Sequence, residues 1–148
     1  LHQKRKDLSR IQIIEFSILF IILNYLDLAL KKLEDLSEID FLAEKNESLK
    51  KEITNYLIEG NDKDLINKKI NDSFNKTIRE INENSNIQII IKNKNDDEIL
   101  NLLDELIKDH KEQSNLRKIE SLEQKLINNL DESSYSELIK LKSQLNRE

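Results

Sequence analysis

The sequence predicts an all-α protein: a helical bundle followed by a long connector helix and a C-terminal helical hairpin. The chain has 148 residues with one Gly and no Pro, whereas an average domain of this length holds about ten Gly and seven Pro. Turns and sheets draw on those residues, so their near absence favours helices joined by Asn, Asp and Ser loops. Apolar residues also recur at helical spacing along most of the chain.

The longest apolar stretch, residues 16–26, predicts a buried helix at the centre of the bundle. The helix expected over residues 7–23 is apolar around most of its circumference, as in a helix surrounded by others. The stretch is 11 residues long, whereas a bilayer span needs about 20. No small-residue cleavage site of a signal peptide follows it. We therefore expect a cytoplasmic protein without a membrane segment.

Two short helical segments are expected next, each with its own signal. The first is a helix over residues 25–35, after which Ser37 and Asp40 resemble the cap of the following helix. That following helix is expected to end at Gly60, the only glycine in the chain. Glycine readily adopts the left-handed conformation that closes many helices.

The predicted bundle spans residues 1–107. Its next part is expected to be one helix followed by a less regular segment. The helix is expected from Asn61 to about residue 83 because its apolar residues keep helical spacing. Residues 84–95 contain the run Ile87–Ile91, which has β-strand character but no convincing partner strand in so helical a chain. We expect a packed loop or a short helix there.

The next helix is expected to begin at Asn95, with Glu98 three residues later, the spacing of a capping box. Apolar side chains follow at helical spacing as far as Ile107, and residues 108–115 are then entirely polar. We expect this connector, residues 108–115, to leave one core and cross solvent before the helix enters a second core. Its histidine, His110, is predicted to lie on the surface.

The remaining segment, residues 116–148, predicts two helices joined as an αα-hairpin. Residues 131–133 are expected to form the turn, and Ser134 with Glu137 the capping box of the last helix. Each buried leucine-sized side chain contributes about 1.5–3 kcal/mol, whereas ordering the backbone costs roughly 1–2 kcal/mol per residue. Two helices alone are therefore marginal, and we expect the hairpin to dock on a partner; the alternative is that it folds back onto the bundle.

Residue types that carry catalysis are scarce. Cysteine is absent and the two histidines, His2 and His110, lie far apart in the sequence, so neither a thiolate zinc site nor a Ser-His-Asp triad is indicated. A single glycine does not make a phosphate-binding loop. Acidic residues between Asp96 and Glu105 are better explained by the helix dipole than by a magnesium site. We expect no catalytic residue, no cofactor and no small-molecule substrate for this chain.

The net charge of −5 lies in the C-terminal third of the chain. Residues 1–95 hold 16 acidic and 16 basic side chains, whereas residues 96–148 hold 13 acidic and 8 basic ones. An acidic surface repels phosphate backbones, so direct binding to nucleic acid is not expected. Lys4, Arg5 and Lys6 form a small basic N-terminus that is more typical of a solvated lead-in.

Three stretches resemble the C-terminal helicase-binding domain of bacterial DNA primase. Residues 11–41 (IQIIEFSILFIILNYLDLALKKLEDLSEIDF) are similar to the family's apolar first helix, its short second helix and an acidic-aromatic turn, here residues 39–41. Residues 96–113 (DDEILNLLDELIKDHKEQ) resemble its long helix. Residues 121–148 resemble its closing hairpin, whose last helix typically reads Leu-x-x-Leu-x-x-x-Leu.

The resemblance implies a non-enzymatic domain that recruits primase to the N-terminal domain of the replicative helicase and stimulates the helicase. Upstream catalytic domains, with zinc and magnesium, would synthesise the RNA primers. The partner-binding residues that it implies lie on the hairpin and are Tyr135, Leu138, Ile139, Lys142 and Leu145, supported by Ile119, Leu122 and Leu126. The alternatives are the N-terminal domain of the helicase itself and a helical structural or adaptor protein. The second is disfavoured because the heptad pattern fails across residues 108–115.

Overall fold

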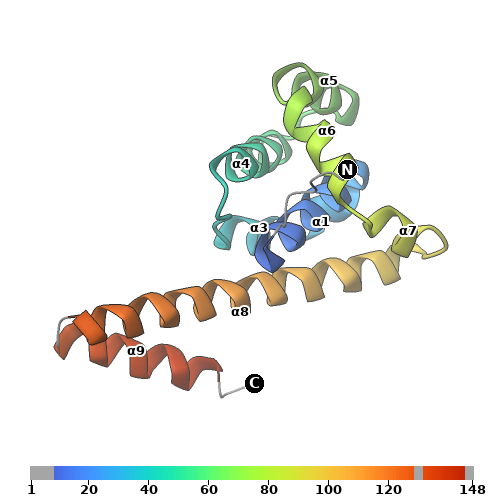
Figure 1. The fold of residues 1–148 in the computed structure, drawn as a ribbon. Helices are drawn as coiled ribbons and strands as arrows, with labels where there is room; N and C mark the ends of the chain where they lie inside the picture. The colour runs from blue at the N-terminus through green and yellow to red at the C-terminus, as the bar shows by residue number, and fades with distance from the viewer. Residues whose placement is uncertain (1–8, 129–131, 146–148) are drawn as a thin grey trace, which may run out of the picture. The chain divides into compact units, whose positions relative to one another are not determined.

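The computed structural model describes residues 9–128 and 132–145, and every regular element within them is a helix (Figure 1). The all-α prediction is confirmed. The chain divides into two compact units, residues 1–108 and residues 109–148, which we call the bundle unit and the hairpin unit. The helices are α1 (Arg10–Asn24), α2 (Leu26–Lys31), α3 (Leu33–Glu38), α4 (Glu44–Ile58), α5 (Lys63–Ser73), α6 (Asn75–Asn84), α7 (Ile87–Ile91), α8 (Asp96–Asn128) and α9 (Glu132–Leu145).

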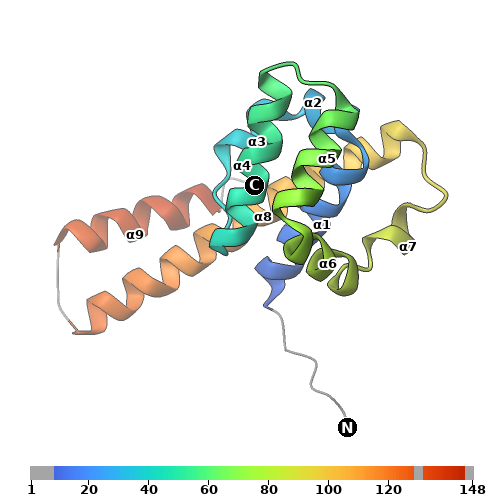
Figure 2. The same cartoon turned by 90° about the horizontal axis from the view of Figure 1, so that it is seen from above.

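Helix α1 lies at the centre of the bundle unit, as its apolar circumference predicts. It packs against α2, α4, α6 and α7 (Figure 2), and Ile18, Ile21 and Ile22 have no exposed surface. Its first turn is closed by a capping box that the sequence prediction missed. The Ser9 hydroxyl accepts the N–H of Gln12 at 3.3 Å, and the Gln12 side-chain oxygen accepts the N–H of Ser9 at 3.0 Å. This box places the start of the helix at Arg10 rather than at residue 7.

The single short helix expected over residues 25–35 is two helices, α2 and α3. The backbone leaves the helical conformation at Lys32, with φ −116° and ψ 23°. The predicted cap formed by Ser37 and Asp40 is wrong, because Ser37 lies inside α3 and α4 begins only at Glu44. No side chain of the residue before Glu44 caps α4. The start of α4 is instead satisfied from another helix.

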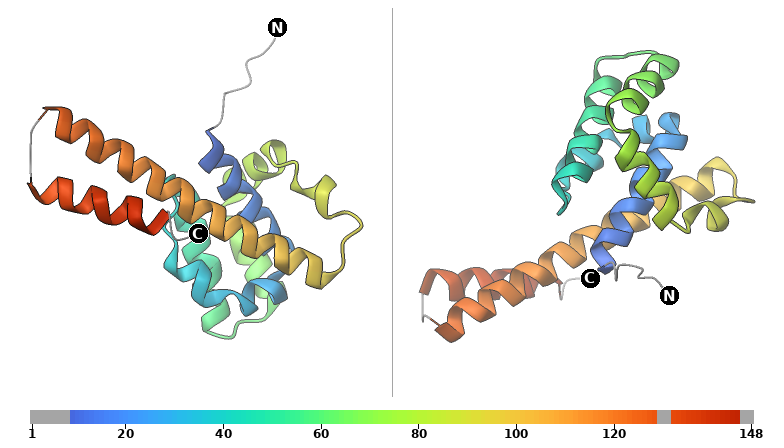
Figure 3. Two further views of the ribbon diagram at one scale, coloured as in Figure 1. Left: turned by 90° about the horizontal axis from the view of Figure 1, so that it is seen from below. Right: turned by 45° about the horizontal axis from the view of Figure 1, so that its top comes forward.

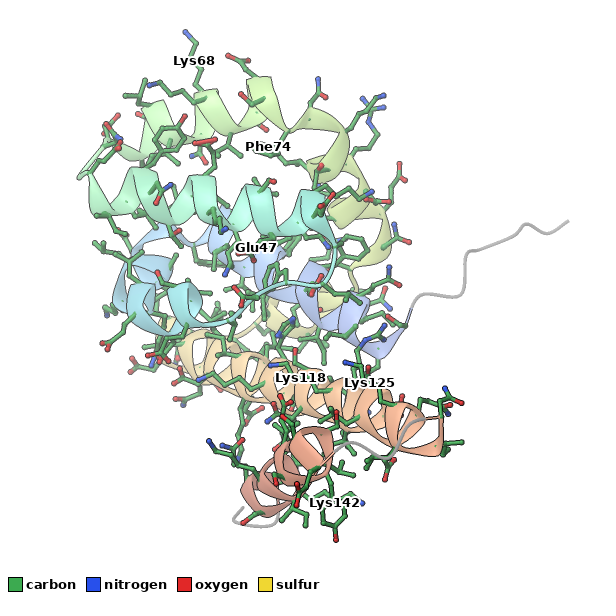
Figure 4. The ribbon with its side chains drawn as sticks, turned by 90° about the vertical axis from the view of Figure 1, so that its left-hand side faces the viewer. Glu47, Lys68, Phe74, Lys118, Lys125 and Lys142 are labelled. Atoms are coloured by element: carbon green, nitrogen blue, oxygen red, sulfur yellow. The ribbon has the colours of Figure 1, made fainter. Side chains whose placement is uncertain are left out.

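A buried carboxylate on α1 binds the segment that leads into α4. Glu15, which has no exposed surface, accepts the backbone N–H of Leu42 at 2.5 Å and the side-chain N–H of Asn46 at 3.2 Å. Glu47 accepts the N–H of Phe41 at 2.8 Å. Glu47, labelled in Figure 4, lies in the first turn of α4, and 16% of its side chain is exposed. Because buried backbone groups and charges need partners, these bonds fix where the loop lies against α1.

Lys50 of α4 binds backbone carbonyls at the end of α3, as Glu15 binds backbone N–H groups before α4. Its ammonium donates to the carbonyl of Leu36 at 2.8 Å and to the carbonyl of Ile39, and it lies 3.2 Å from the carboxylate of Glu47. It also lies 5.2 Å from the centre of the Phe41 ring. Only 2% of Lys50 is exposed. Its charge therefore satisfies the last carbonyls of α3 where water is excluded.

Gly60 ends α4 as the sequence predicts. Its φ is 77°, its N–H donates to the carbonyl of Leu57 at 3.1 Å, and the N–H of Asn61 donates to the carbonyl of Tyr56 at 3.1 Å. These two bonds form a Schellman motif, which needs a residue in the left-handed conformation.

The helix expected from Asn61 to residue 83 is broken into α5 and α6 at Phe74. Phe74 has φ −125° and ψ 29° and is half-buried against the core. The break lets α6 turn back so that it packs on α1 as well as on α5. The run that follows forms the short helix α7, one of the two forms expected for it.

Helix α8 begins with the predicted capping box. The N–H of Asn95 donates to Glu98 at 3.0 Å, and the N–H of Glu98 donates to the Asn95 side chain at 2.9 Å. Within the bundle unit the Lys32 ammonium lies 2.7 Å from the Asp104 carboxylate of α8. The hydrogen bond to Asp104 raises the pKa of Lys32, and partial burial opposes this rise.

The connector prediction is only partly right. Helix α8 continues without interruption through residues 108–115, but His110 is 1% exposed and therefore buried. The prediction of a surface histidine in a solvated stretch is wrong. His110 is thus buried although its neighbours in the sequence are polar.

Helix α9 begins at Glu132, so the predicted capping box of Ser134 and Glu137 is wrong: both residues lie inside the helix. Ser133, expected in the turn, is also helical. The remaining turn residue Asp131, the predicted ends of both hairpin helices, the basic residues near the N-terminus and His2 lie outside the described residues. Among the helices that are described, none is long and apolar enough to cross a membrane.

We predict that Lys50→Met destabilises the bundle unit by about 3 kcal/mol. The substitution keeps most of the side-chain volume but leaves the carbonyls of Leu36 and Ile39 without their buried donor. Urea unfolding followed by circular dichroism measures the change. Lys51→Met is the matched control, since Lys51 is the exposed neighbour on the same helix. Equal stability of the two variants would contradict the role assigned to Lys50.

We predict that Gly60→Ala lowers the free energy of unfolding by about 1 kcal/mol. A Cβ at Gly60 meets no atom within 4 Å, so the cost comes from the left-handed backbone alone. Gly60→Asn should cost less, because Asn tolerates this conformation better than Ala. Thermal unfolding of the three proteins gives the order, and an Ala variant as stable as the parent would rule out the conformational explanation.

Candidate protein-binding surface

The hairpin unit consists of two antiparallel helices with a very small core. Ile119 and Leu122 of α8 and Leu138 of α9 are buried against each other. The half-buried side chains of Leu126, Leu141 and Leu145 surround them. Figures 2 and 3 show the end of α8 and α9 side by side along their length. Three buried side chains contribute on the order of 5–9 kcal/mol at most, little for two helices to be ordered.

The eight hairpin residues named from the sequence fall into two groups. Five of them are buried or half-buried in the hairpin core and hold it together: Ile119, Leu122, Leu126, Leu138 and Leu145. The other three, Tyr135, Ile139 and Lys142, are exposed on α9. The three exposed residues can contact a partner, and the five core residues hold α9 against α8.

The exposed residues of α9 share one side of the hairpin with two residues of α8. Tyr135 and Ile139 lie one turn apart on α9 and are 55% and 50% exposed. Leu116 and Ile127 of α8 are also exposed, Ile127 to 75%. An ion pair of 3.1 Å between Lys142 and Glu123 shows that these sides of the two helices adjoin.

We call Leu116, Ile127, Tyr135 and Ile139 the hairpin face. Leu116 and Ile127 are 11 residues apart on α8, which places them within about 20° of each other around the helix. Glu123 lies between them on the same side, and it binds Lys142, which shares its side of α9 with Tyr135 and Ile139. The hairpin face thus consists of four exposed apolar side chains on two helices, with the Glu123–Lys142 ion pair among them.

Charge is distributed unevenly around the hairpin. The exposed carboxylates of Glu120 and Glu132 flank the hairpin face. The exposed Lys118 and Lys125, labelled in Figure 4, lie about 180° around α8 from Ile127 and Leu116. Glu120, Glu132 and the Glu123–Lys142 pair thus border the hairpin face, while Lys118 and Lys125 lie on the other side of α8.

Sequence reasoning missed Leu116 and Ile127 as members of a surface. Both belong to the apolar pattern of α8 but fall outside the stripe of Ile119, Leu122 and Leu126. Ile127 directly follows Leu126 and so lies about 100° further around the helix. A helical-wheel projection of residues 116–127 would have separated the two groups.

The hollows described in the bundle unit are small. Two hollows that share Leu23, Asn24 and Asn67 hold about 180 and 220 Å³, less than the 300–1,000 Å³ or so of typical small-molecule sites. In the part of the chain that the structure describes, no three His, Asp or Glu side chains gather closely enough to hold a metal ion. The hairpin face is the strongest candidate for a functional surface.

Comparison with known proteins identifies no relative. Neither a protein-family model nor a curated protein nor a solved structure matches the chain. The function is therefore inferred from the hairpin face and from the pattern of the sequence.

We predict that Leu138→Ala opens the hairpin without unfolding the bundle unit. The cavity left in so small a core should cost about 2–5 kcal/mol, comparable to the stability that the hairpin core can supply. Hydrogen exchange should accelerate throughout α9 and stay slow in α1. Ile139→Ala, at the exposed neighbouring position, should leave both rates unchanged. Equal acceleration in α1 would mean that the two units unfold together.

Proposed function

We propose that this chain is the helicase-binding domain of a bacterial DNA primase, and that its hairpin docks on the N-terminal domain of the replicative helicase. The chain itself would carry no catalysis; primer synthesis would belong to other domains of the primase. The observation that carries the proposal is the hairpin face. Its four apolar side chains are exposed on two helices and do not belong to the small core between them.

The architecture supports this proposal. A helical bundle, a long helix that leaves it and a closing hairpin are the arrangement that the resemblance to primase implies, and the elements occur here in that order. Among its described residues the terminal hairpin has three buried apolar side chains, so it would gain from a partner that covers its other apolar residues.

The composition of the hairpin face also suits protein recognition. Tyr135 offers a large apolar ring with one polar group, a residue type enriched among those that dominate binding energies. The Glu123–Lys142 pair beside it is about half exposed. Such a pair contributes little affinity but helps to orient the partner. Tyr135 and Ile139 are therefore expected to supply most of the binding energy.

We predict that the N-terminal domain of the helicase from the same organism binds this chain, and that Tyr135→Ala and Ile139→Ala each weaken binding about tenfold or more. Isothermal titration at low salt measures the affinities. Lys140→Ala is the matched control, since Lys140 is exposed on α9 but on the side away from the hairpin face. It should bind like the parent protein.

The outcomes separate the partner from the surface. Absence of binding by the parent chain at tens of micromolar would reject the helicase as the partner. Binding that persists in both Ala variants but is lost when residues 116–148 are removed would keep the partner and reject the hairpin face. Binding that survives this deletion would place the contact in the bundle unit.

A further inference from the structure

We draw no further inference here: the strongest candidate, the surface patch formed by the exposed Ile89 and Ile90 on α7 of the bundle unit, adjoins exposed lysines and exposed carboxylates alike, and nothing in the structure shows what covers it.

Discussion

One buried carboxylate organises the bundle unit. Helix α1 is apolar on nearly all sides and must be enclosed, yet it carries Glu15 at a position with no exposed surface. A charge buried in this way persists only if hydrogen-bond donors surround it. The donors come from the segment entering α4, which is therefore held against α1. Lys50 of α4 in turn binds the end of α3. The positions of α1, α3 and α4 therefore depend on two buried charged side chains, Glu15 and Lys50.

Some features determined by neighbouring residues were predicted correctly from the sequence, although the local capping box of Ser9 and Gln12 was missed. Features determined by distant residues were not predicted. The capping box of Asn95 and Glu98 and the closure at Gly60 need only local chain, and both occur as expected. The start of α4 depends on Glu15, which is 27 positions away from Leu42. The break at Phe74 similarly depends on how its ring packs in the core. The spacing of apolar residues along the sequence indicates neither the Glu15–Leu42 hydrogen bond nor the packing of Phe74.

The same distinction applies to the candidate surface. The resemblance placed the candidate residues on the hairpin, but it could not say which side chains of α9 face α8. Leu138 is buried and Ile139 is exposed, although both are aliphatic and adjacent. Their difference depends on the register of α9 against α8, which the Glu123–Lys142 pair reflects and which no single-helix pattern contains. The sequence therefore assigned the candidate surface to the hairpin helices, and the packing of α9 against α8 shows which side of them is exposed.

The small core of the hairpin would make the proposed docking on a partner dependent on temperature. A binding-competent conformer that is only partly populated lowers the apparent affinity in proportion to its fraction. Because three buried apolar side chains among the described residues hold α9 to α8, warming would deplete the closed hairpin before the larger core of the bundle unit melts. Binding to the proposed partner would therefore weaken at temperatures at which the bundle unit is still folded.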